Sequence, residues 1–189
     1  MRMTAPAAAR NRDAILAVLR AHLPDSGILL EIASGTGEHA AHFAAGLRDW
    51  QFQPSDPVAE RRASIDAWCA DLPNVAPALA LDATEPWPAI RADAVLCCNM
   101  IHIAPWEAAL GLLRNAAALG AILILYGPYI RNGVPTAPSN LAFDADLRSR
   151  DARWGLRRVE DVVAAAAGFR LQRVIPMPAN NLSIILRKI

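Results

Sequence analysis

Residues 28–40 contain the feature that most restricts the fold, an apolar run that ends near an acid and is followed by two glycines one residue apart. The apolar run over 28–32 predicts a buried parallel strand. Small residues after it, including Gly35 and Gly37, let the backbone pass close to a ligand where a Cβ would clash. A helix from about Glu38 would direct its amide groups at that ligand. The segment therefore predicts the nucleotide-binding turn of an α/β fold.

Two classes of cofactor use such a turn. Glu31, followed by Ala33, Gly35 and Gly37 at alternate positions, resembles the acid-x-Gly-x-Gly-x-Gly motif of S-adenosylmethionine (SAM) methyltransferases, with Ala33 in place of the first glycine. The run from Gly35 through Gly37 to Ala40 also satisfies the dinucleotide pattern, so the glycines alone leave both classes open. Glu31 favours SAM, because a carboxylate suits the cationic amino group of the methionine part and poorly serves a pyrophosphate.

Strand-like apolar segments alternate with helical ones, which predicts a doubly wound α/β fold in one domain spanning residues 1–189. Strands are expected near 28–33, 51–55, 76–81, 93–98, 121–126, 169–175 and 181–187, and helices near 10–22, 38–47, 58–70, 106–118 and 157–167. The last two strands should pair as a hairpin. We therefore expect a Rossmann-like, seven-stranded sheet with five parallel strands, a C-terminal antiparallel hairpin and helices on both faces. This arrangement is usual for methyltransferases, whereas a dehydrogenase half would continue with another crossover helix.

Ligands of doubly wound folds bind beyond the carboxyl ends of the strands, so the polar residues there are candidate cofactor contacts. Asp56 follows the second expected strand and can accept hydrogen bonds from both ribose hydroxyls. Asp82 follows the third, where its carboxylate can accept from an adenine amino group while the amide of Ala83 faces a ring nitrogen. Either acid could instead cap a turn or a helix. The fourth strand is followed by residues expected to run below the methionine part and to contact adenine: Asn99, Met100 and Ile101.

Several segments together resemble the methyltransferase-like 26 family. They are Arg10-Asn-Arg-Asp13, the glycine turn, Asn99-Met-Ile-His-Ile103 and Ser139-Asn-Leu-Ala-Phe-Asp144, and the similarity covers nearly the whole chain. The resemblance implies a SAM-dependent methyltransferase fold in which Arg10 and Asn11 close over the cofactor. Ala33 departs from the general motif but suits this family. The predicted cofactor contacts are Arg10, Asn11, Glu31, Ala33, Gly35, Gly37, Glu38, His39, Asp56, Asp82, Ala83, Asn99, Met100 and Ile101.

Methyl transfer from a sulfonium requires alignment and exclusion of water rather than a covalent nucleophile. His102 is the candidate general base, because the exit of the fourth strand borders the methyl group in this fold. The alternatives are that it packs against the cofactor or hydrogen-bonds the loop. The segment 127–155 is long for a loop and is expected to cover the substrate, or else to be a solvated cover. Its polar and aromatic groups suited to an acceptor include Tyr129, Asn140 and Asp144.

Composition limits the partners. The net charge of +1 provides no field that draws the chain to nucleic acid or to an anionic membrane. The three cysteines lack metal-ligand spacing, which indicates reduced thiols and no metal site. Neither a signal peptide nor a membrane-spanning segment is recognisable, so we expect a soluble cytoplasmic protein.

These patterns predict a SAM-dependent methyltransferase that acts on a small-molecule acceptor and releases S-adenosylhomocysteine (SAH). The Asn-Pro-Pro-Tyr element used for amino groups of adenine or glutamine is absent after the fourth strand, which weakens an amide methyltransferase hypothesis. Two alternatives stay open: a non-catalytic SAM-binding or partner-binding module and, less favoured, an NAD-dependent oxidoreductase.

Overall fold

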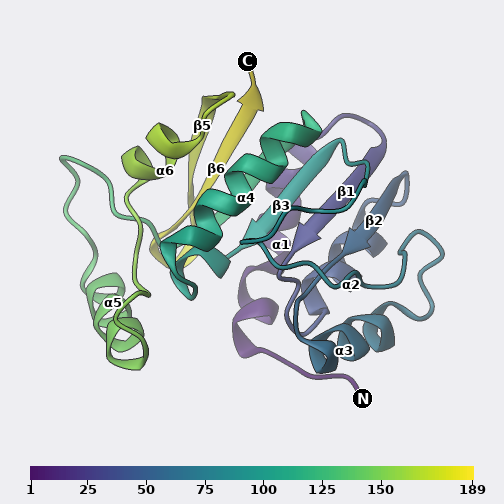
Figure 1. Ribbon diagram of the computed structural model, residues 1–189. Coiled ribbons are helices and arrows are strands. Elements are labelled where there is room, and N and C mark those ends of the chain that lie inside the picture. The colour runs from purple at the N-terminus through teal and green to yellow at the C-terminus, as the bar shows by residue number, and fades with distance from the viewer.

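Four parallel strands and an antiparallel pair form one six-stranded sheet in the computed structural model, which describes residues 1–189 (Figure 1). The strands are β1 (Gly27–Ile32), β2 (Trp50–Pro54), β3 (Ala94–Cys98), β4 (Ile122–Gly127), β5 (Phe169–Met177) and β6 (Asn181–Lys188). Their order is β2-β1-β3-β4-β6-β5, and β6 runs antiparallel to β4 and to β5. The predicted α/β class and C-terminal hairpin are therefore confirmed.

Helices cover both faces of this sheet. The helices are α1 (Pro6–His22), α2 (Glu38–Gly46), α3 (Ala59–Cys69), α4 (Trp106–Leu119), α5 (Pro138–Arg150) and α6 (Val159–Ala165), with short 3-10 turns η1 (Met100–His102) and η2 (Pro178–Asn180). Residues of α1 and α2 pack on one face, and residues of α4 and α6 on the other. None of these helices has both the length and the apolar character needed to cross a membrane.

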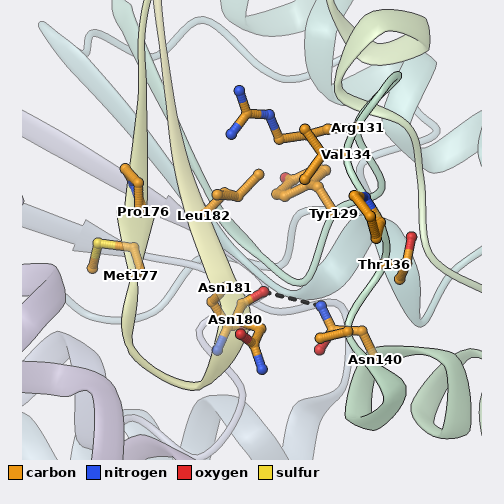
Figure 2. Close-up of a pocket in the computed structure, with 12 residues that line it drawn as sticks. Tyr129, Arg131, Val134, Thr136, Asn140, Pro176, Met177, Asn180, Asn181 and Leu182 are labelled. Atoms are coloured by element: carbon orange, nitrogen blue, oxygen red, sulfur yellow. Dashed lines mark hydrogen bonds between the residues drawn. The ribbon is translucent and has the colours of Figure 1, made fainter.

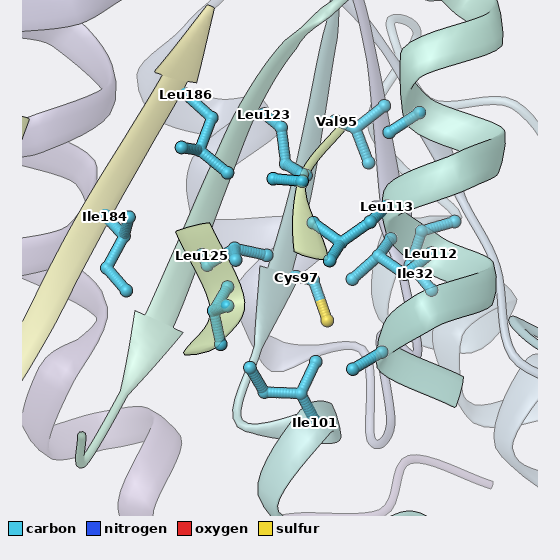
Figure 3. Packing of buried hydrophobic residues seen from close by; sticks show 14 of the residues in the cluster. Ile32, Val95, Cys97, Ile101, Leu112, Leu113, Leu123, Leu125, Ile184 and Leu186 are labelled. Carbon is cyan, nitrogen blue, oxygen red and sulfur yellow. The ribbon is translucent and has the colours of Figure 1, made fainter. Parts of the chain in front are cut away.

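Alternate residues of the central strands enter two separate cores. In β1, Leu29 packs with the core of α1 and α2, whereas Leu30 packs with the core of α4 and α6. Figure 3 shows the second core, where Leu112 and Leu113 of α4 belong to the same cluster as Cys97 of β3. Burial on both faces explains why these strands read as continuous apolar runs. Burial on both faces also holds the carboxyl ends of β1 and β3 in place.

The strand expected over 76–81 does not form, so the prediction of seven strands is wrong. Residues 75–79 contact β2 and the residues after it through two isolated parallel bridges, Phe52 with Val75 and Ser55 with Leu79, and through a few hydrogen bonds. Proline is the physical reason, because Pro54 of β2 has no amide hydrogen to donate to the Ala76 carbonyl, the next bond after that from the Ala76 amide to the Phe52 carbonyl. The sheet consequently has four parallel strands rather than five.

The segment expected to be a long loop contains a helix. Helix α5 starts with Pro138 at its first position, where proline costs no hydrogen bond. The Asp144 carboxylate accepts from Arg148 Nε at 2.9 Å one turn later, which supports the helix from its surface. In Figure 1 α5 stands apart from the sheet, beyond the carboxyl ends of the parallel strands. A covering role for 127–155 stays a prediction.

Candidate functional site

The glycine turn connects β1 to α2 through three residues with left-handed backbone. Ala33, Gly35 and Gly37 have φ values of 55°, 60° and 92°. A Cβ on Gly37 would lie 2.6 Å from Ile65 Cα, so this glycine allows α3 to pack closely. A Cβ on Gly35 would meet no atom nearer than 4.0 Å, so the space beside this residue is open. The turn thus presents open backbone at the carboxyl end of β1, where doubly wound folds bind ligands.

Glu31 is a buried acid with no partner for one of its oxygens. The residue is 2% exposed, and its Oε2 atom makes no hydrogen bond. Burial raises the pKa of this carboxyl to about 7; a Ser34 hydrogen bond opposes the shift and the nearby Asp56 charge adds to it. Burying an unpaired carboxylate is costly. The site therefore favours a ligand that brings a positive charge or a hydrogen-bond donor.

His39 and Cys98 converge on the same point from other elements. A carboxylate oxygen of Glu31, a ring nitrogen of His39 and the sulfur of Cys98 all lie within 4.8 Å of one another. Asn11 Oδ1 is 2.7 Å from His39 Nε2, which holds the imidazole from α1. Burial lowers the pKa of His39 to about 4 and raises that of the Cys98 thiol, so both side chains are neutral near pH 7. We call Glu31, His39 and Cys98 the acid corner.

Asp56 is placed behind the glycine turn. The residue is fully buried, and its carboxylate accepts from the amide of Gly35 at 3.1 Å and from that of Val58 at 3.0 Å. Arg61 Nη1 lies 3.7 Å from the same carboxylate. These bonds connect the end of β2 to the turn. Asp56 thus has the capping role that the sequence left open as an alternative. A hydrogen bond to a ribose stays a prediction.

The other predicted cofactor residues divide between the edge and the core. Asp82 is exposed and accepts at Oδ1 from the amide and hydroxyl of Thr84, at 2.8 and 2.7 Å. Asn99 has a left-handed φ of 63° at the end of β3. In contrast, the residues that the structure buries in the α4-side core are Ala83, Met100 and Ile101. Their predicted contacts with adenine are not tested.

The first residues of the chain lie against the site, a feature that sequence reasoning reached only in part. The amide of Ala5 donates to the Glu38 carboxylate, so Glu38 holds the chain start. The amide of Met3 donates to Ser64 Oγ at 2.8 Å, and Ser64 Oγ donates to the Thr36 carbonyl at 2.7 Å. We call residues 1–5 the N-terminal strap. Arg10 is exposed on α1, and no hydrogen bond from its side chain is present.

His102 is packed among other side chains rather than placed for proton transfer. The residue is fully buried, and neither ring nitrogen has a hydrogen-bond partner. Burial, followed by the Arg157 charge, lowers the pKa of His102 to about 3. Its ring lies 4.6 Å from the ring of Tyr129, edge to face, and a Cβ on Gly127 would come within 2.4 Å of Nε2. This environment argues against proton transfer by His102 and against a ring hydrogen bond to the loop, while packing against a cofactor stays a prediction.

A hollow lies farther along the same edge of the sheet, near the ends of β4 and β6. It has a volume of about 220 Å³ and lies between the segment after β4 and the turn of the β5–β6 hairpin (Figure 2). Tyr129 and Asn140 line it, as predicted for the acceptor side. Asp144 does not line it; this carboxylate accepts from the amide of Leu156 at 2.7 Å and from Arg148.

The hairpin supplies lining residues that were not identified as site residues from the sequence. Asn180 and Asn181 border the hollow, and the Asn140 side-chain amide donates to the Asn180 carbonyl at 3.0 Å (Figure 2). Ala179 and Asn180 have φ values of 56° and 58°, an unusual pair of left-handed residues. The available signal was the Asn-Asn pair in the expected hairpin connection, since asparagine tolerates this conformation.

A family model described as a protein of unknown function, DUF938, matches residues 2–188. The chain belongs to the DUF938 family. Its description assigns no activity, so the geometry above and the fold have to support any functional proposal.

Solved methyltransferases have the same fold as this DUF938 protein. The mitomycin 7-O-methyltransferase MmcR has a TM-score of 0.80 at 19% identity, over 97% of this chain and 54% of MmcR. CalO1, a methyltransferase in calicheamicin biosynthesis solved in an SAH-bound form, has a TM-score of 0.76 at 18% identity, over 94% and 54%. NcsB1, an O-methyltransferase solved with SAM and 2-hydroxy-5-methyl naphthoic acid, has a TM-score of 0.75 at 13% identity, over 97% and 55%. The DUF938 chain thus spans about half the length of each.

Proposed function

We propose that this DUF938 chain is a SAM-dependent methyltransferase that acts on a small-molecule acceptor and releases SAH. The observation that carries the proposal is the buried carboxylate of Glu31, one oxygen of which has no partner, beside the open backbone of Gly35. The methionine part of SAM has the cationic amino group that such a carboxylate needs. The methyltransferase fold and the resemblance to the methyltransferase-like 26 family support the same proposal.

The residues at the site fit this cofactor. Glu31 would accept from the amino group, and the open turn at Gly35 leaves room for the nucleoside beside the carboxyl ends of β1 and β2. Neutral His39 and Cys98 add no charge that would repel the sulfonium. SAM supplies an activated methyl group, so the protein's own contribution is binding, alignment and exclusion of water.

The acceptor would occupy the hollow lined by Tyr129 and Asn140. The hollow lies near the ends of β4 and β6, two to three strand spacings or roughly 10–15 Å from the glycine turn along the same edge of the sheet. No acid or histidine lines it. The proposal therefore assigns the enzyme a positioning role, with His102 as a packing residue beneath Tyr129.

The environment of His102 favours one second candidate, a SAM-binding module without turnover. A histidine with a pKa near 3 is a poor general base near pH 7. An acceptor that needs a base would then react slowly or not at all. The NAD-dependent alternative is disfavoured, because Glu31 would stand beside a pyrophosphate and the sheet ends in a hairpin.

Isothermal titration of the purified chain with SAM, SAH and NAD tests the proposal. We expect both sulfur nucleotides to bind and NAD to fail. Replacing Glu31 with glutamine should weaken SAM binding, while Glu85→Gln, which removes an exposed acid elsewhere, should leave it unchanged. Binding of NAD alone, or equal SAM binding by all three proteins, would refute the assignment.

A further inference from the structure

The acceptor hollow contains a single charged residue, Arg131. The other lining residues are apolar or carry neutral polar groups. Arg131 is exposed at the mouth, and its guanidinium makes neither a hydrogen bond nor an ion pair. Figure 2 shows it extending from the segment after β4 toward the hairpin that forms the opposite wall. The hollow thus has one unit of positive charge that the protein does not neutralise.

Tyr129 and Arg131 face the hollow together because the backbone between them is extended. Ile130 forms a parallel bridge with Arg158, and its amide donates to the Arg157 carbonyl at 3.0 Å. Side chains alternate along an extended segment, so Tyr129 and Arg131 point to one side while Ile130 points to the other. The Tyr129 hydroxyl is buried and has no hydrogen-bond partner. Arg131 therefore offers its donors to the hollow, whereas the Tyr129 hydroxyl is shut off from solvent within the core.

The amide groups of the hollow are already committed to the protein. Asn140 donates to the Asn180 carbonyl at 3.0 Å, Asn180 donates to Ser139 Oγ at 3.3 Å, and Asn181 donates to the Pro178 carbonyl at 3.0 Å. These bonds hold the left-handed turn of the hairpin in place. The side-chain donors left for a ligand are the guanidinium of Arg131 and the hydroxyl of Thr136, which makes no hydrogen bond within the protein.

We propose that this hollow binds the carboxylate of a small acid, with the guanidinium of Arg131 paired to the carboxylate. A guanidinium matches a planar carboxylate with two parallel hydrogen bonds. One arginine suits a monoanion better than a phosphate dianion, which would keep an unneutralised charge. The volume of about 220 Å³ is below the roughly 300–1,000 Å³ of sites for drug-sized ligands, which limits the ligand to about one ring.

The identification of this small acid as the substrate of the methyltransferase rests on the proposed function. The carboxylate would lie at the β4–β6 end of the edge, so the atom that receives the methyl group belongs to the other end of the acid, toward Asn99. The acid anchors the acceptor and does not itself react. Binding of the acid, however, needs no SAM and can be measured alone.

Ligand-observed NMR with benzoate as the probe tests the site. Benzamide has the same shape without the charge, and phenyl phosphate tests a dianion. The variants are Arg131→Gln and Tyr129→Phe, with Arg170→Gln as the matched control because it removes an exposed arginine of β5 outside the hollow. We expect benzoate to bind more tightly than benzamide and phenyl phosphate. Arg131→Gln should weaken benzoate by at least about tenfold, whereas Tyr129→Phe, which removes a hydroxyl buried in the core, should change it by less than about twofold.

Three results would overturn the inference: no benzoate binding to the unmodified chain, equal binding of benzoate and benzamide, or equal losses for Arg131→Gln and Arg170→Gln. Tighter binding of phenyl phosphate would replace the carboxylate with a phosphate as the ligand class. Titration of SAM into the same samples separates the two proposals. SAM binding without benzoate binding removes only the acid site, and the reverse result removes only the methyltransferase.

Discussion

The Nε2 atom of His39 lies 2.7 Å from the Oδ1 atom of Asn11, so α1 holds the imidazole of the acid corner in place. The contact joins residues 28 positions apart and stacks the His39 ring 5.1 Å from Phe43. This contact fixes the imidazole in the group that it forms with Glu31 and Cys98. The corner is thereby organised before a ligand enters, which reduces the entropy lost on binding.

Asn11→Ala should weaken SAH binding by about three- to tenfold, since one net hydrogen bond that orders His39 is lost. Thermal unfolding should change little, because Asn11 lies near the surface. Asn115→Ala removes a comparable side-chain bond, to the Glu85 carbonyl at 2.8 Å, and is the matched control. Calorimetry that finds equal SAH affinities for both variants would argue against a positioning role for Asn11.

SAH affinity should rise with pH through the titration of Glu31. Burial raises the pKa of this carboxyl to about 7, so below pH 7 it is largely protonated and lacks the charge that attracts an ammonium group. Between pH 5.5 and 7.5 the ionised fraction grows, and Kd should fall by about tenfold or more. Calorimetric titrations at several pH values measure the slope. Glu31→Gln should abolish it, and a slope that persists in this variant would assign the effect to another group.

The two glycines of the turn should respond differently to alanine. Gly37→Ala places a Cβ 2.6 Å from Ile65 Cα at a φ of 92°, so we expect a loss of about 2–4 kcal/mol in the free energy of unfolding. Gly35→Ala meets no atom nearer than 4.0 Å and should cost only about 1–2 kcal/mol for its left-handed φ. Urea unfolding measures both.

Binding should show a different pattern in the same pair. Gly35→Ala fills the open side of the turn, so it should weaken SAH binding despite its milder effect on stability. A Gly35→Ala protein that binds SAH as tightly as the unmodified chain would move the cofactor away from this backbone.

Ser64→Ala should release the N-terminal strap. The Ser64 hydroxyl accepts from the Met3 amide and donates to the Thr36 carbonyl, so its loss should cost about 1 kcal/mol of stability. Hydrogen exchange at the Met3 and Ala5 amides should speed up while that of β1 stays slow. Unchanged exchange at Met3 would mean that the strap is held mainly by Trp68, whose Nε1 donates to the Met3 carbonyl at 2.7 Å.

Local sequence patterns were enough to predict most of the fold. The glycine turn, the helices around it and the C-terminal hairpin follow from apolar runs and turn residues that are contiguous in the sequence. The strand over 76–81 was predicted from its apolar residues, but Pro54 of the neighbouring strand cannot continue the ladder. Helix α5 was missed because only Asn140 and Leu147 are buried along it, so no apolar stripe marks it.

The site was predictable only where one segment carries it. Glu31, Gly35 and Gly37 belong to a single turn, and the sequence identifies them directly. The acid corner includes Cys98 from another strand, and the acceptor hollow includes Asn180 from the hairpin. Both sites therefore depend on tertiary contacts. The position of His102 after β3 was correctly anticipated, but its complete burial was not, because neighbours such as Tyr129 and Gly127 decide it.

The most direct test of the cofactor site compares SAH with 5′-methylthioadenosine, which lacks the amino-acid part, on the unmodified chain and on Glu31→Gln. If Glu31 binds the amino group, calorimetry should find SAH binding weakened at least about tenfold in the variant and 5′-methylthioadenosine binding unchanged. Equal losses for the two ligands, or no loss for either, would contradict the assignment of Glu31 to the methionine part of SAM.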